Sequence, residues 1–116
     1  MREPVRDINR LKHILQAIDN IKNYTQGITS AEELDNDPLR KHATTYNVQI
    51  IGEAIYKLTF EFKNNHPETP WRMIEKSRHI LVHDYYQVEM NILWSIITED
   101  LDPLREQVTS YIQELE

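Results

Sequence analysis

Two glycines in 116 residues, combined with apolar residues that recur every three or four positions, constrain this chain more than any other feature. With so few glycines and only five prolines there is little material for hairpin turns. The first 20 residues already show the helical spacing, because Ile8, Leu11, Leu15 and Ile18 lie at offsets 0, 3, 7 and 10. We therefore expect an all-α fold, a four- to five-helix up-down bundle in one domain over residues 1–116.

Capping and breaking residues predict where the first helices begin and end. The first helix should begin near Pro4 and end near residues 24–27, before an acidic, polar linker at residues 28–39. The second should begin at Pro38 with Asp37 as its N-cap and continue as far as Phe62. Gly52 interrupts this helix at a cost of about 1 kcal/mol, which is tolerable if another backbone comes close there.

The second half of the chain carries similar signals. A third helix can begin at Pro70 behind Thr69, and a fourth after Asp84, with Asp84 as N-cap and Gln87 at the third helical position. The pair Asp102-Pro103 then predicts either a second cap and restart or a kink.

Composition excludes several classes of protein. Without cysteine there is no disulfide framework, no thiolate nucleophile and no cysteine zinc site. No apolar run approaches the ~20 residues of a membrane span, and the first residues lack the apolar core of a signal peptide, so we expect a soluble, cytoplasmic protein. A net charge of −6 argues against indiscriminate coating of nucleic acid, and any nucleic-acid role must rest on a local patch.

One arginine breaks the apolar pattern of the third helix. Arg78 continues the stripe of Trp71 and Ile74 at offsets 0, 3 and 7. A guanidinium in a core is costly unless it is paired, so Arg78 either pairs with a carboxylate such as Glu53 or belongs to an anion site. Residues 72–83 carry two arginines and Lys76 against one glutamate, a local charge of +2.

His83 is the natural chemical partner of Arg78. On a straight helix the two side chains would point about 140° apart, so either the helix ends near residue 82 or a second copy of the chain closes the gap. A helix starting at Asp84 would place its N-terminal amides beside His83 and favour a phosphate there. Histidine can move a proton between a ribose hydroxyl and a leaving oxygen while arginine stabilises charge on phosphorus. A symmetric dimer would supply both acid and base.

We expect neither a metal site nor a cofactor. His79 and His83 are four residues apart, as two ligands on one helix face would be, but the sequence specifies no third ligand.

Arg78, His83 and Tyr85 together form an R-x4-H-x-Y motif. With its surroundings this motif resembles the HepT-like proteins, the toxin branch of the HEPN superfamily of ribonucleases. The likeness extends from residues 6–7 to Leu104. It includes residues 51–54, 66–72, 81–85, 94–97 and 100–101.

The resemblance implies a dimerising HEPN-type bundle with metal-independent endoribonuclease activity on RNA. It implies that Arg78 and His83 are catalytic, and that a nucleotidyltransferase antitoxin of the MntA type transfers AMP to Tyr85. The HEPN family commonly has Asn or Asp where this chain has His79, which alters the hydrogen bonding around the phosphate. Four further residues are expected to support the site or bind phosphate: Glu53, Lys76, His79 and Asp84.

Two other interpretations stay open at this point. The chain could be a non-catalytic helical module that binds a nucleotidyltransferase or a nucleotide, with Arg78 on the phosphate. It could also be a purely structural bundle, in which Arg78 pairs internally with Glu53 and its loss costs several kcal/mol.

Overall fold

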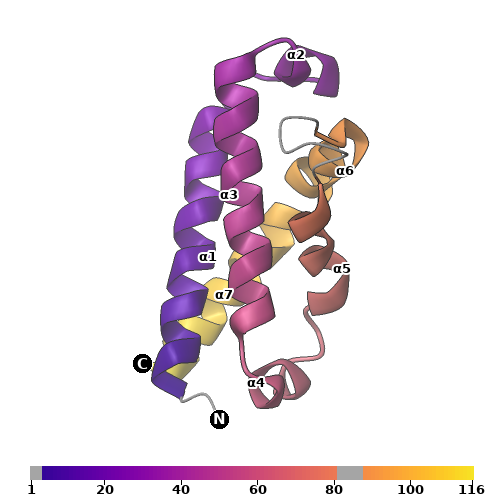
Figure 1. The fold of residues 1–116 in the computed structure, drawn as a ribbon. Helices are drawn as coiled ribbons and strands as arrows, with labels where there is room; N and C mark the ends of the chain where they lie inside the picture. The colour runs from indigo at the N-terminus through magenta and orange to yellow at the C-terminus, as the bar shows by residue number, and fades with distance from the viewer. Residues whose placement is uncertain (1–3, 81–87) are drawn as a thin grey trace.

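The computed structural model describes residues 4–80 and 88–116, and within these ranges it contains helices and no β-strand, which confirms the all-α prediction (Figure 1). Three long helices form the body: α1 (Pro4–Tyr24), α3 (Pro38–Lys57) and α7 (Leu101–Leu115). The shorter elements are α2 (Ala31–Asp35), α4 (Phe60–Asn65), α5 (Trp71–Glu75), the 3₁₀ turn η1 (Lys76–His79), α6 (Met90–Ser95) and the π-helical turn η2 (Ile96–Asp100).

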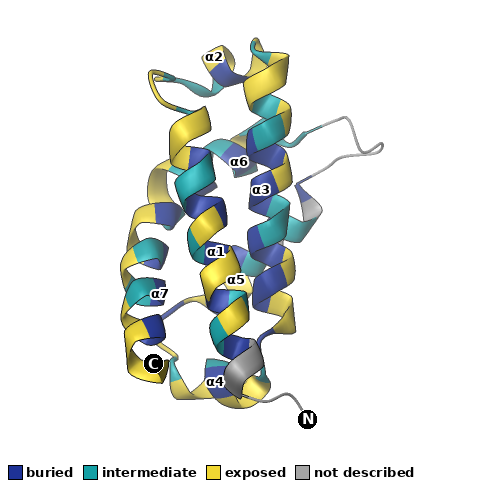
Figure 2. Ribbon diagram, turned by 90° about the vertical axis from the view of Figure 1, so that its left-hand side faces the viewer, coloured by how far each residue is buried: buried dark blue, intermediate teal, exposed yellow. Residues whose placement is uncertain are grey.

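The core lies between the three long helices. Helix α1 packs along α3 and against α7, and the opposite flank of α3 receives α5 and η1. Figure 2 shows the buried residues as stripes on the facing sides of these helices. Of the stripe predicted for the first helix, Leu11 and Ile18 are fully buried, whereas Ile8 and Leu15 are only partly buried and pack against the core. Helices α3 and α7 contribute core residues at similar helical spacing: Val48, Ile51, Ile55, Leu104 and Val108. None of the described helices combines the length and the apolarity that crossing a membrane requires.

The local signals at two helix boundaries act as the sequence predicts. Asp37 caps α3 by accepting a hydrogen bond from the Arg40 amide at 3.2 Å. Helix α1 ends at Tyr24, and Gly27 follows with φ +85°, a backbone conformation that glycine adopts without strain.

The segment predicted to be a linker contains a helix. Ser30 caps α2 by accepting a hydrogen bond from the Glu33 amide at 3.1 Å. Leu34 on α2 is completely buried and anchors this turn on the core. The prediction was wrong because it relied on the acidic composition of the segment and overlooked the helix-capping signal in its sequence.

The second helix ends earlier than predicted. Helix α3 stops at Lys57, and α4 begins after Thr59, whose hydroxyl caps it by accepting from the Phe62 amide. The buried Asp7 carboxylate accepts hydrogen bonds from the Thr59 amide at 2.9 Å and from its hydroxyl at 2.7 Å. This contact spans 52 residues, so periodicity could not predict the break.

The helix expected after Asp84 begins later, at Met90. Val88 lies outside it, and Asp84 and Gln87 lie outside the described residues. Downstream, a separate α-helix does begin at this place: α7 starts at Leu101, which puts Pro103 in its first turn, and the π-helical turn η2 connects it to α6. Asp102, the predicted cap, lies inside α7 instead of before it. The Leu101 amide donates to the Ile96 carbonyl, the five-residue step of a π turn.

Candidate active site

Arg78 lies on η1, where the helix begun by α5 tightens. Trp71 and Ile74 are buried as predicted, but the change to 3₁₀ winding turns Ser77 and Ile80 into the core. The prediction that Arg78 would continue the buried stripe was therefore wrong, because the stripe assumed an α-helical step. The Arg78 side chain is 26% exposed, at the edge between core and solvent.

Two residues of α3 hold the Arg78 side chain. Its Nε donates to Glu53 Oε1 at 2.9 Å, and its guanidinium carbon lies 4.0 Å from the centre of the Tyr56 ring. Glu53 and Tyr56 are three residues apart on α3 and share a face. The Glu53 side chain is 51% exposed, and a pair this open to solvent contributes about 1 kcal/mol or less. These contacts therefore fix where the guanidinium sits more than they stabilise the fold.

Gly52 lets η1 approach α3 closely enough for those contacts. A Cβ at this position would lie 2.3 Å from Ser77 Oγ, 2.7 Å from Arg78 Cγ and 3.0 Å from the Arg78 amide nitrogen. The last of these is backbone, so any side chain here would push η1 away from α3. The predicted reason for a glycine inside this helix is confirmed.

The other predicted site residues lie on or after η1. Lys76 and His79 are on η1, but their side chains, like His83, Asp84 and Tyr85, are outside the described residues. The Glu89 amide donates to the Ile80 carbonyl at 2.6 Å, so the described residues on either side of the gap at 81–87 meet at one place. That place is two residues from Arg78. The geometry of His83 and Tyr85 relative to Arg78 stays a prediction.

Sequence reasoning found Glu53 as a partner of Arg78 and missed Tyr56. The available signal was its spacing, since Tyr56 follows Glu53 by three positions on a predicted helix. Among the described residues, no group of three or more His, Asp or Glu side chains is arranged to hold a metal ion.

Comparisons with known proteins agree with the motif. The model of the family described as Ribonuclease HepT-like matches residues 14–111. A "Putative RNase" of Caldanaerobacter subterraneus subsp. tengcongensis is 35% identical over 103 residues, covering 89% of this chain and 91% of that protein. The "Probable ribonuclease HepT" of Thermococcus cleftensis is 35% identical over 95 residues, covering 82% of this chain and 86% of its own length.

A longer relative matches over only part of its length. The "Gamma-glutamylcyclotransferase and putative RNase" of Methanocaldococcus jannaschii is 30% identical over 106 residues, which cover 91% of this chain. The chain spans about half of that protein, 47% of its length. No solved structure matches the chain significantly. The family match and these relatives establish that the chain belongs to the ribonuclease HepT-like family, a family of RNA-cleaving enzymes, as the motif of Arg78, His83 and Tyr85 predicts.

Proposed function

We propose that this chain is a metal-independent endoribonuclease toxin whose site combines Arg78 and His83, with the two copies of a homodimer contributing to it. The observation that carries the proposal is the state of Arg78. Its guanidinium is fixed by Glu53 and Tyr56 and yet partly open to solvent, three residues before the segment 81–87 that carries the rest of the motif. A positioned and accessible guanidinium suits an anionic ligand better than it suits a structural ion pair.

The chemistry follows from the two side chains. One His83 takes the proton of the ribose 2′-hydroxyl as its oxygen attacks phosphorus, and a second protonates the leaving 5′-oxygen. Arg78 stabilises the negative charge that builds on the phosphate oxygens. A single histidine cannot easily perform both proton transfers, which is the reason for a two-fold arrangement.

The exposed face of α3 supports a dimer around this site. Tyr46, Gln49, Glu53 and Tyr56 lie at offsets 0, 3, 7 and 10, so they form one stripe along α3. Tyr46 is 66% exposed and Tyr56 is 50% exposed, which is unusual for aromatic side chains next to a core. A second copy packed on this stripe would bring its own site beside Glu53 and Arg78.

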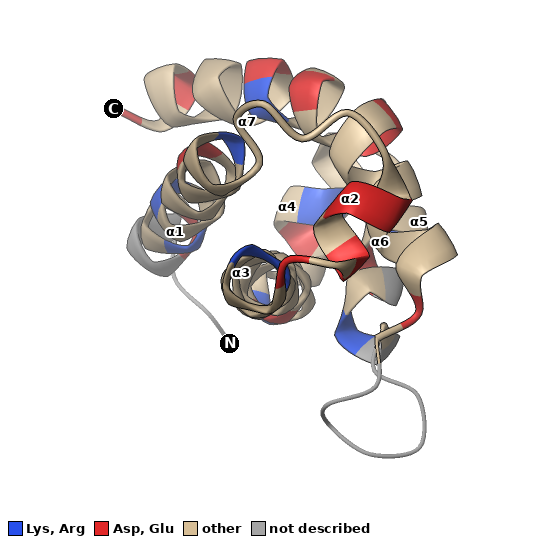
Figure 3. Ribbon diagram, turned by 90° about the horizontal axis from the view of Figure 1, so that it is seen from above, with Lys and Arg blue, Asp and Glu red and all other residues tan. Residues whose placement is uncertain are grey.

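The acidic residues behind the net charge of −6 are not spread evenly over the described fold. Part of the acidic excess belongs to α2, where Glu32, Glu33 and Asp35 gather at one end of the bundle (Figure 3). Arg72 and Arg78 lie on α5 and η1 instead. Positive potential concentrated there, doubled by a two-fold axis, would attract RNA at low salt without tight non-specific binding.

The direct test is cleavage of RNA by the purified protein in excess EDTA. We expect cleavage to persist, because neither His83 nor Arg78 needs a metal for proton transfer or charge stabilisation. Products should be followed by gel electrophoresis, with Arg78→Ala protein purified in parallel to reveal contaminating nucleases. Complete loss of cleavage on chelation, or equal cleavage by the parallel variant, would contradict the proposal.

The regulatory part of the proposal concerns Tyr85. A MntA-type nucleotidyltransferase antitoxin would direct the Tyr85 hydroxyl to the α-phosphorus of ATP, forming an AMP-tyrosine phosphodiester and releasing pyrophosphate. Intact mass after co-expression with such an enzyme should show added AMP, which peptide mapping should assign to Tyr85. Tyr85→Phe should remain unmodified and Tyr86→Phe should still be modified. An unchanged mass would contradict the proposed pairing with a nucleotidyltransferase antitoxin.

The pair of Arg78 with Glu53 also favours a second candidate, a non-catalytic module that binds a nucleotidyltransferase or a nucleotide. In that case Glu53 would simply neutralise Arg78 until the partner's phosphate displaces it. Tight partner binding with no RNA cleavage at any protein concentration would identify this function.

A further inference from the structure

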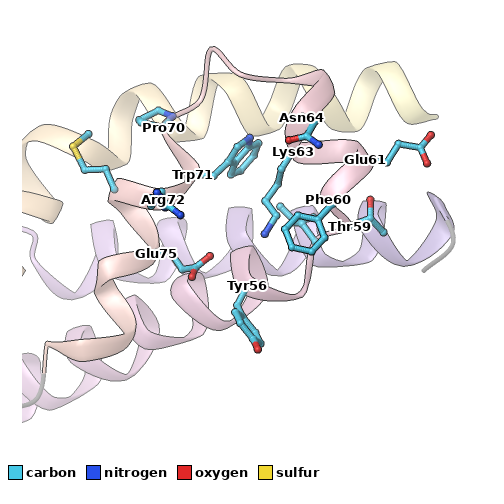
Figure 4. Close-up of a pocket in the computed structure, with 12 residues that line it drawn as sticks. Tyr56, Thr59, Phe60, Glu61, Lys63, Asn64, Pro70, Trp71, Arg72 and Glu75 are labelled. Atoms are coloured by element: carbon cyan, nitrogen blue, oxygen red, sulfur yellow. The ribbon is translucent and has the colours of Figure 1, made fainter. Parts of the chain in front are cut away.

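A groove with a volume of about 1250 Å³ lies beside the candidate active site, and the proposed function does not use it. It is bounded by the end of α3, by α4 and by α5. Arg72 and Glu75 on α5 face Phe60 and Lys63 on α4 across it, with Trp71 between them (Figure 4).

The groove presents aromatic rings together with cations. Phe60 is 82% exposed and lies outside the core, which is unusual for a phenylalanine. The Lys63 ammonium is held 5.5 Å from the centre of the Phe60 ring and donates to the Ile55 carbonyl at 3.2 Å. Trp71 is buried and borders the groove, with its Nε1 donating to the His66 carbonyl at 3.0 Å. Trp71 is therefore fixed by the core, and Phe60 offers an open ring face beside it.

The groove is continuous with the candidate active site. Tyr56 lines the groove and also lies under the Arg78 guanidinium. Glu75 and Arg72 line it about one turn and two turns before Arg78, respectively, on the same helical run. An RNA strand bound at Arg78 could therefore continue into the groove while staying in contact with the protein surface.

We propose that this groove binds a nucleotide of the substrate RNA next to the scissile phosphate, with its base stacked on Phe60 and its phosphate at Arg72. The inference rests on the proposed function for its choice of RNA. Exposed aromatic rings beside cations are the lining that single-stranded nucleic acids use, because every base has a face that stacks. The planar guanidinium group of arginine can donate two hydrogen bonds to one phosphate. Two carboxylates also line the groove, but Glu61 points away from its middle, and Glu75 can accept from a base amino group (Figure 4).

Trp71 is a built-in reporter for this test. The chain has two tryptophans, so a Trp94→Phe background isolates the fluorescence of Trp71. The probe is a short single-stranded oligoadenylate with 2′-O-methyl riboses, which the enzyme cannot cut. We expect it to quench Trp71 saturably, and AMP alone to quench it only at much higher concentration. Equal affinity for AMP would make this a mononucleotide site and overturn the inference.

Two substitutions with matched controls give the size of the effect. Phe60→Ala should weaken binding about 5- to 150-fold, the range that loss of one stacked base implies. Arg72→Ala should lower the slope of log affinity against log salt by about 0.7, as expected for one lost phosphate contact. Leu39→Ala, at the other end of α3 and also strongly exposed, should match the parent protein, and Lys12→Ala controls for net charge. Melting temperatures should be unchanged, because both groove side chains are exposed.

Failure of this inference is distinguishable from failure of the proposed function. If the wild type cleaves RNA but the probe leaves Trp71 unaffected, or Phe60→Ala binds as Leu39→Ala does, only the groove assignment is wrong. If no cleavage occurs but Trp71 responds as described, the groove binds single-stranded RNA and the proposed ribonuclease activity is wrong. A groove that takes a protein segment instead would show no response to RNA, which overturns the inference.

Discussion

Replacing Arg78 with alanine is expected to reduce RNA cleavage about a hundred- to a thousand-fold while changing the free energy of unfolding by about 1 kcal/mol or less. The loss of rate follows from removing the group that stabilises charge on phosphorus. The small loss of stability follows from exposure, because the Glu53 side chain is half exposed and the Arg78 side chain is partly exposed. Cleavage rates and urea denaturation on the same preparations measure the two effects separately.

The matched control is Arg40→Ala, which removes another arginine ion pair associated with α3, between Arg40 and Asp37 at 3.5 Å. It should lose similar stability and no activity. Arg78→Lys should fall between wild type and alanine, since lysine keeps the charge but not the planar fork that lies on Tyr56. A loss of several kcal/mol on Arg78→Ala, with activity falling only in proportion to unfolding, would support the purely structural role.

Replacing His83 with alanine is expected to abolish measurable cleavage, since loss of a general acid or base alone costs about a hundred- to ten-thousand-fold and His83 is proposed for both roles. Secondary structure by circular dichroism and dimer mass by light scattering should match the wild type. The parallel control is His42→Ala, at an exposed position of α3, which should leave cleavage intact. Undiminished cleavage by the His83 variant would remove the mechanism.

Much of the fold could be predicted because its signals are local. The cap at Asp37 and the end of α1 before Gly27 depend on neighbouring residues, and both are where the sequence places them. The break before Thr59 depends on Asp7, which is 52 residues away in the chain, and no local pattern contains it. Local signals can also be misjudged, since Ser30 capped a helix in a segment that its acidic composition assigned to a linker.

The candidate site likewise has some features that the sequence predicts and others that depend on tertiary packing. A conflict between residue type and periodicity singled out Arg78, and the chemistry of a charged group near a core pointed to Glu53 as its partner. The position of Arg78 at the edge of the core could not be predicted, because it depends on the tightening of η1 against α3 at Gly52. Tyr56 was missed for a related reason, since only the packing of two elements brings its ring beneath the guanidinium.

The most direct test of the account is a crystal structure of the protein bound to RNA that carries a 2′-O-methyl group at the scissile position. We expect a two-fold dimer in which an Arg78 guanidinium and a His83 imidazole contact the same phosphate. Arg78 and His83 directed to different places, with no second molecule bringing the two groups together, would contradict it.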